Sequence, residues 1–222
     1  LTTLILVINA GLYLATLSYS GGSLDPSFQA LQVFGAKDGY AIFRGMQWWR
    51  LITAGFLHGG VLHIVMNSWV LWDLGPQIDQ IFGSYRYIAI YLLSSVAGFA
   101  ASLFWSPTVL SIGASAGISG LIGAMVGLGT REKHTIIGRE RGRYIQWMVL
   151  VMAQGFIISG IDNAAHMGGF VGGFCVAYLS GARGSARGDD GLWKTIAIVC
   201  GAVTAYAFFR MVEQLLLLRA QS

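Results

Sequence analysis

The sequence has few charged residues: Asp, Glu, Lys and Arg together make up only 11% of its 222 residues. Hydrophobic residues make up 55% of it, and the mean hydropathy is +0.63. This composition excludes an ordinary soluble globular domain and indicates an integral membrane protein. Cysteine is also scarce. Both cysteines, Cys175 and Cys200, lie in apolar runs, so they predict no disulfide framework.

Long apolar runs are what the sequence has in abundance. A helix needs roughly 20 apolar residues to cross the hydrocarbon of a bilayer, and the runs do not alternate as membrane strands would. We therefore predict an all-α, polytopic membrane helical bundle with about seven transmembrane helices. The 31 glycines favour close contacts between these helices. The predicted spans lie near 1–18, 56–74, 87–105, 113–130, 144–160, 163–180 and 193–217.

Basic residues predict how the chain crosses the membrane. They gather between the fourth and fifth runs and after the sixth run, and positively charged loops stay on the cytoplasmic side. This places the N-terminus inside, the C-terminus outside, and the segments 19–55, 106–112 and 161–162 on the outer face. The net charge of +4 is explained by this topology, so we expect no nucleic-acid partner. The basic residues are Arg131, Lys133, Arg139, Arg141, Arg143, Arg183, Arg187 and Lys194.

Four polar residues interrupt the apolar runs at one predicted depth. His63 and Asn67 are four residues apart in the second run and so share one helix face. Ser115 opens the fourth run, and His166 lies near the start of the sixth. With the predicted topology, all four lie in the outer half of the bilayer. Polar side chains are costly there, which makes this group a candidate functional site.

These residue types suit covalent hydrolysis. A serine hydroxyl becomes nucleophilic when a base takes its proton, and His166 is the candidate base for Ser115. Ser115 lies in a first helical turn, where free N–H groups favour an oxyanion. His63 and Asn67 offer further donors to that oxyanion. Ser119 is a rival nucleophile, but only Ser115 lies in the first turn.

Small residues are expected to bring the fourth and sixth spans together. Gly169 and Gly173 lie on the stripe that carries His166. On the other span we expect Gly113, Gly117 and Gly120 to remove bulk in the same way. Asp162 precedes His166 by four residues, and we interpret it as the N-cap of the sixth span.

The combination of these motifs resembles the rhomboid family of intramembrane serine proteases, over most of the chain. The resemblance implies a six-helix catalytic core over 1–181, with a cytoplasmic linker and a seventh helix over 182–222. We expect Trp49 and Arg50 to hold the segment 20–50 in place. The matching pieces are Trp49-Arg50, His58-x4-His63-x3-Asn67, Gly113-Ala114-Ser115 and Ala165-His166-x2-Gly169-x3-Gly173.

The resemblance also implies an activity. It predicts a Ser115–His166 dyad, an oxyanion site made by His63, Asn67 and the Ser115 backbone N–H, and cleavage of transmembrane segments that enter from the lipid. The implied partners are membrane-protein substrates and membrane lipids, with no metal or organic cofactor. The implied location is a bacterial cell inner membrane, with the active site toward the non-cytoplasmic side. Two positions depart from the family pattern: Ala116 replaces a glycine and Ser119 replaces an aromatic residue.

Three other functions remain open from the residues alone. One is a catalytically inactive rhomboid-like protein that binds membrane clients. Another is a transporter, although no inverted repeat is visible. The third is a metal-dependent membrane protein, although no His-Glu-x-x-His helix is present. Its candidate ligands are His58, His63, His166 and Asp162.

Overall fold

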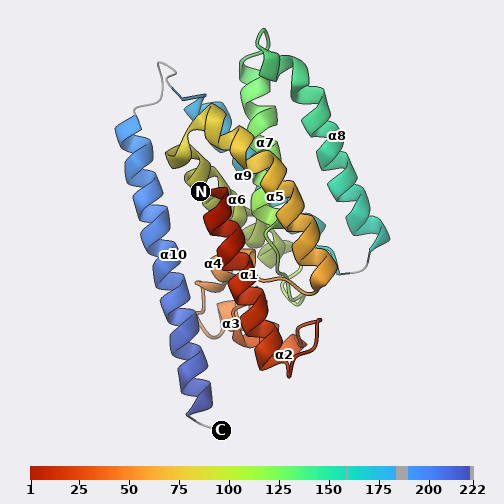
Figure 1. Ribbon diagram of the computed structural model, residues 1–222, viewed down its shortest axis with the longest axis vertical. Coiled ribbons are helices and arrows are strands. Elements are labelled where there is room, and N and C mark those ends of the chain that lie inside the picture. Colours follow the sequence, from red (N-terminus) through yellow and green to blue (C-terminus); the bar gives the residue numbers. More distant parts are fainter. Residues whose placement is uncertain (159, 184–189, 221–222) are drawn as a thin grey trace.

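The chain folds into a bundle of helices, as predicted. The computed structural model describes residues 1–158, 160–183 and 190–220, and these residues form helices and no strand (Figure 1). A short 3₁₀ helix, Ala54–Phe56, follows α4. The α-helices are α1 (Thr2–Tyr19), α2 (Phe28–Val33), α3 (Gly39–Phe43), α4 (Arg50–Thr53), α5 (Val61–Phe82), α6 (Ser84–Trp105), α7 (Ser115–Arg131), α8 (Ile136–Ile157), α9 (Asn163–Ser180) and α10 (Asp190–Arg219).

Each predicted span corresponds to one long helix, namely α1 and α5 to α10. By length and hydropathy, α1, α6 and α10 could each cross a membrane. A fourth span results if Arg50–Phe56 and Val61–Phe82, which are bent by 90° to each other, count as one. Two of the remaining long helices fall outside these limits of length and hydropathy, because α7 has only 17 residues and α8 carries several charges in its first two turns.

The basic region between the fourth and fifth spans differs from the prediction. Helix α8 begins at Ile136, so Arg139, Arg141 and Arg143 lie on a helix and not in a loop. The Thr135 side chain caps α8 by accepting a hydrogen bond from the Gly138 N–H (3.2 Å). Arginine and glutamate are good helix formers, so the helix extends beyond the apolar run that hydropathy detects. Arg187 lies outside the described residues.

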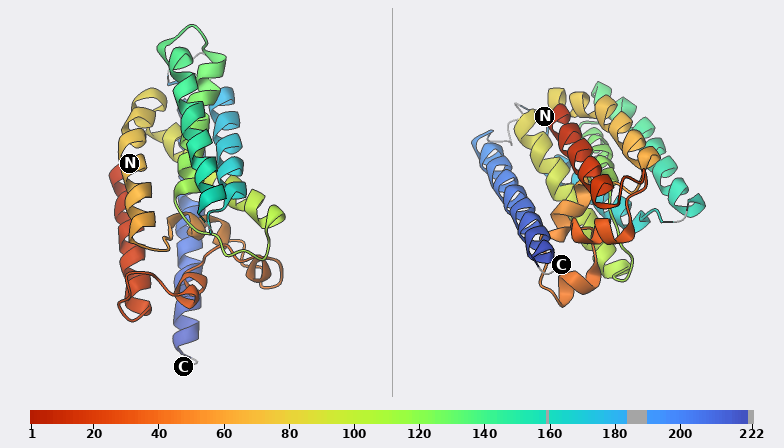
Figure 2. Two further views of the ribbon diagram at one scale, coloured as in Figure 1. Left: turned by 90° about the vertical axis from the view of Figure 1, so that its right-hand side faces the viewer. Right: turned by 60° about the horizontal axis from the view of Figure 1, so that its bottom comes forward.

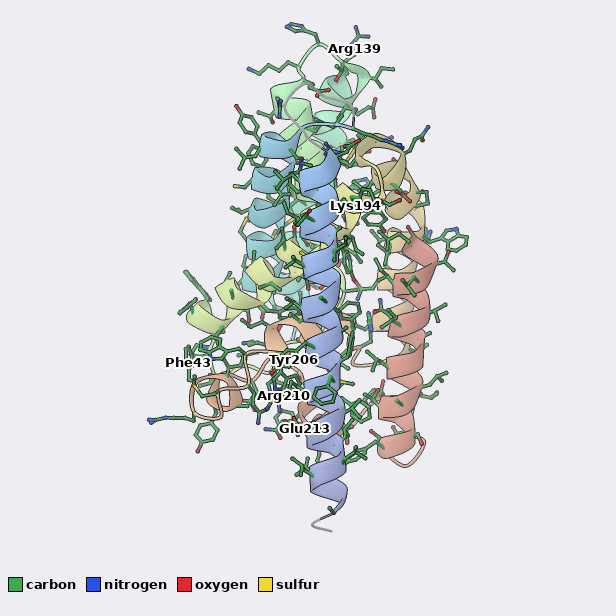
Figure 3. The ribbon with its side chains drawn as sticks, turned by 90° about the vertical axis from the view of Figure 1, so that its left-hand side faces the viewer. Phe43, Arg139, Lys194, Tyr206, Arg210 and Glu213 are labelled. Atoms are coloured by element: carbon green, nitrogen blue, oxygen red, sulfur yellow. The ribbon has the colours of Figure 1, made fainter. Side chains whose placement is uncertain are left out.

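The basic end of the bundle and the segment 20–50, which the topology prediction places on the outer face, lie toward opposite ends of the molecule. Figure 3 shows this with Arg139 at one end and Phe43 toward the other. On the exposed side of α10, Arg210 pairs with Glu213 at 2.8 Å and donates to the Tyr206 hydroxyl at 3.2 Å. Arg210 therefore adds little net positive charge at the end of α10 that the topology prediction assigns to the outer face.

The segment 20–50 is held by Arg50. Arg50 is 2% exposed, and its guanidinium donates to the carbonyl oxygens of Gln32 (2.7 Å) and Ala36 (3.0 Å). It also donates to the side chain of Gln47 (2.6 Å) and lies over the Trp49 ring at 4.9 Å. These contacts confirm the structural role that the sequence predicts for this pair.

Helix α7 is the central element of the bundle. Every residue from Ala116 to Gly129 is buried, and the helix lies among α5, α6, α8 and α9 (Figure 2). Helix α9 packs along α7 with backbone against backbone. A Cβ at Gly173 would overlap the carbonyl of Gly120, and one at Gly123 would overlap that of Phe170. The predicted close approach of these two helices is therefore confirmed.

The glycines that make this contact are not all those expected. The carbonyl of Gly120 contacts α9, while a Cβ on Gly120 would meet Ser94 of α6. Gly117 packs against the Tyr91 ring of α6, and Gly113 packs against His63. Gly117 follows Ala116 by one residue, which turns it about 100° away from α9. The stripe of α7 that faces α9 is formed by Ala116, Gly120, Gly123 and Gly127.

The contact between α7 and α9 generates a stability prediction. Gly173→Ala should lower the free energy of unfolding by about 1–3 kcal/mol, because the new methyl group overlaps backbone that cannot move aside. Gly11→Ala in α1 is the matched control, since nothing lies within 4 Å of its added Cβ. It should be neutral or slightly stabilising. Thermal unfolding in detergent measures both, and equal melting temperatures would contradict the prediction.

Candidate active site

The backbone before α7 passes tightly against His63. Gly113 has a φ of +126°, in the region that favours glycine. Its N–H donates to the carbonyl of Ala54 (2.9 Å). A Cβ on Gly113 would lie 2.7 Å from Nε2 of His63 and 3.4 Å from Oγ of Ser115. Glycine at this position thus lets the imidazole and the serine hydroxyl approach the same point.

Ser115 and His166 meet across the α7–α9 contact. His166 Nε2 lies 2.8 Å from Ser115 Oγ, although 51 residues separate them in the sequence. The imidazole is 7% exposed, and its Nδ1 has no hydrogen-bond partner within the described parts of the chain. This geometry allows Nε2 to accept the serine proton, as a Ser–His pair requires.

His63 presents a hydrogen-bond donor beside Ser115. Its Nδ1 accepts from the backbone N–H of Gly59 (3.3 Å), so the proton of the neutral ring is on Nε2. Nε2 is the atom that faces Gly113 near Ser115. Asn67, 8% exposed, lies one turn further along α5 on the same face. The ring of His58 packs edge-on against that of His63, with centroids 5.1 Å apart.

The start of α7 adds backbone donors. The N–H of Ile118 donates to the Ala114 carbonyl (2.9 Å), as in a regular helix. The N–H groups before it, including that of Ser115, lie at the positive end of the helix, where intrahelical acceptors are lacking. An oxyanion that forms on a carbonyl attacked by Ser115 would therefore lie near the backbone donors of α7 and near His63 of α5.

The structure also addresses the rival residues. Ser119 lies one turn deeper in α7 and is 1% exposed, whereas the hydrogen bond of His166 goes to Ser115. Asp162 caps α9 as predicted, because its side chain accepts from the Ala165 N–H (3.0 Å). In the part of the chain that the structure describes, no three His, Cys, Asp or Glu side chains are grouped so that they could hold a metal ion.

Two backbone groups of the site escape sequence analysis. The carbonyl of Ala54 anchors Gly113, and the N–H of Gly59 sets the tautomer of His63. Backbone donors and acceptors are present at nearly every position, so no residue type marks them. At position 59 a glycine leaves room for the Ile112 side chain, from which an added Cβ would lie only 3.3 Å away.

Comparisons with known proteins match one family. The Rhomboid domain family matches residues 45–183. Rhomboid protease GluP of Bacillus subtilis (strain 168) is 33% identical over 187 residues, which cover 84% of this chain and 36% of that protein. The mitochondrial RHOMBOID-like protein 6 of Arabidopsis thaliana is 34% identical over 70% of this chain and 51% of its own length. The chain thus spans about a third to a half of these relatives.

The pKa of Asp162 generates a prediction for the pH dependence of stability. Burial alone raises the pKa of this carboxyl, but hydrogen bonds from Ser102 and the Ala165 N–H hold the pKa below its usual value. A carboxyl whose pKa is lower in the folded protein than in the unfolded chain stabilises the fold at pH values above its unfolded pKa of about 4. This stabilisation is lost as the pH falls through the pKa of the folded state. The extra stability of wild type over Asp162→Asn should be constant from about pH 5 to 7 and shrink below about pH 4.

Thermal unfolding of both proteins in detergent across this pH range measures the difference. A melting-temperature gap that stays constant or widens on acidification would contradict the assignment of a stabilising carboxylate.

Proposed function

Since the chain belongs to the rhomboid family, we propose that it is an intramembrane serine endopeptidase that cleaves transmembrane segments of other membrane proteins. The observation that carries the proposal is the 2.8 Å contact between Ser115 Oγ and His166 Nε2. The likeness to GluP, which is named a rhomboid protease, supports it. The chain is a multi-pass membrane protein, and lipid surrounds its bundle.

The proposed reaction is an acyl transfer through Ser115. Its Oγ attacks the scissile carbonyl carbon while His166 Nε2 takes the hydroxyl proton. The tetrahedral oxyanion is stabilised by His63 Nε2–H, the Asn67 amide and the Ser115 backbone N–H. Collapse breaks the C–N bond, and His166 returns the proton to the leaving amine. A water then attacks the acyl-enzyme, with His166 again as the base.

The surroundings of the dyad impose conditions on the substrate. A transmembrane helix already hydrogen-bonds its own carbonyls, so it must unwind locally before Ser115 can attack one of them. We assign the catalytic core to residues 1–181, and the linker and seventh helix to 182–222.

The active site would face the non-cytoplasmic side of a bacterial inner membrane, where water is available to hydrolyse the acyl-enzyme.

Replacing the nucleophile tests the proposal directly. Ser115→Ala should abolish cleavage of a test transmembrane substrate in liposomes and abolish labelling by a fluorophosphonate, because only an activated hydroxyl reacts readily. Ser119→Ala is the matched control and should keep both activities. Labelling of wild type at a residue other than Ser115, or no labelling at all, would contradict the proposal. The second outcome is also what an inactive client-binding protein would give.

The oxyanion donors give a separate prediction. His63→Ala and Asn67→Ala should each lower kcat by about 10²–10³ and change KM little, since the donors act on charge that develops in the transition state. Steady-state kinetics with the same test substrate measure the two constants. A rise in KM with unchanged kcat would instead assign these residues to substrate binding.

A further inference from the structure

One carboxylate lies between the chain segments that deliver the dyad. Asp162 accepts hydrogen bonds from the hydroxyl of Ser102 and from the Ala165 N–H. The side chain of Ser111 lies near enough to help lower the pKa of Asp162. Ala165 directly precedes His166, and Ser111 lies four residues before Ser115. The end of α6, the loop before α7 and the start of α9 therefore meet at this side chain.

A buried lysine accompanies this carboxylate. Lys37 is 0% exposed, and its ammonium donates to the carbonyl of Ser106 (2.9 Å). Its backbone pairs with Ser111 in both directions, at 2.9 and 3.1 Å. A buried ammonium needs a compensating negative charge. The carboxylates that interact electrostatically with Lys37 are Asp162 and Asp38.

The imidazole of His166 needs a group that fixes its orientation. In many serine hydrolases a carboxylate orients the catalytic imidazole through Nδ1. Here Nδ1 of His166 has no partner within the described residues. The direction of the imidazole therefore depends on the first turn of α9, where Asp162 is the N-cap and its carbonyl accepts from the His166 N–H (3.1 Å). The place of Ser115 depends in turn on the loop that contains Ser111.

We propose that Asp162, with Lys37 as its buried counter-charge, is a positioning residue that holds Ser115 and His166 at hydrogen-bonding distance. The inference rests on the proposed protease function and deepens it. Asp162 also interacts electrostatically with His166. Its negative charge therefore stabilises the imidazolium that forms when Ser115 gives up its proton. Asp162 contacts neither substrate nor the reacting atoms in this scheme.

The test compares four variants of the full chain in liposomes. Asp162→Asn keeps the shape of the side chain but removes its charge, so kcat and the rate of fluorophosphonate labelling should fall about tenfold or more, with KM unchanged. Lys37→Met should reproduce that loss, because it leaves the half-buried carboxylate of Asp162 without its counter-charge. Ser111→Ala removes the hydroxyl that lies near Asp162 on the Ser115 side and should slow labelling about three- to fivefold.

Asp38→Asn is the matched control. Asp38 is also an N-capping carboxylate that interacts with Lys37, but it caps α3. Among the described residues its side chain accepts hydrogen bonds from Gln32, Tyr40 and Ala41, all within the segment 20–50. It should keep wild-type kcat and labelling. If the loss of any carboxylate that interacts with Lys37 were enough to disturb the fold, Asp38→Asn would lose activity as well.

The outcomes separate this inference from the proposed function. If wild type is not labelled at Ser115, the protease proposal fails and the positioning role falls with it. If wild type is labelled and Asp162→Asn is labelled at the same rate, only the positioning role is overturned. An equal loss in Asp38→Asn, or wild-type kcat in Lys37→Met, overturns it too. Should Asp162→Asn not fold, an unchanged labelling rate in Ser111→Ala overturns it.

Discussion

The backbone contact between α7 and α9 is the constraint on which the site depends. At Gly120 and Gly173 the two helices approach so closely that a methyl group would overlap a carbonyl. Serine is a short side chain, and imidazole reaches only a few ångströms from its own helix. The 2.8 Å contact between Ser115 and His166 is therefore possible only because small residues remove the bulk that normally separates helices.

Around this contact, hydrogen bonds of backbone groups hold the irregular segments between the helices in place. Ala54 anchors Gly113, Gly59 holds His63, and Lys37 pairs with Ser111. Where water is scarce, an unmade backbone hydrogen bond is costly, so each of these connections has one favoured conformation. A site with a single hydrogen-bonded dyad can then keep its geometry without a carboxylate on Nδ1 of His166.

Sequence analysis predicted the helices well because its signals are local. Runs of apolar residues predict a helix wherever they occur, and each predicted span is a long helix in the structure. The two errors have different causes. The start of α8 at Ile136 depends on the adjacent Thr135 cap and on charged helix formers, which a search for apolar runs does not detect. The contact of Gly117 with Tyr91 depends on where α6 lies, which no local pattern shows.

The sequence by itself determined the all-helical class, the spans and the four polar residues that they carry, because hydropathy and helical periodicity are properties of neighbouring residues. Only the tertiary structure decided that His63 presents Nε2–H to the site, and that Asp162 accepts from Ser102 and feels the charge of Lys37 and the hydroxyl of Ser111. These groups come from segments up to 125 residues apart, Lys37 to Asp162. Their partnership follows from how the helices pack, which no local spacing encodes.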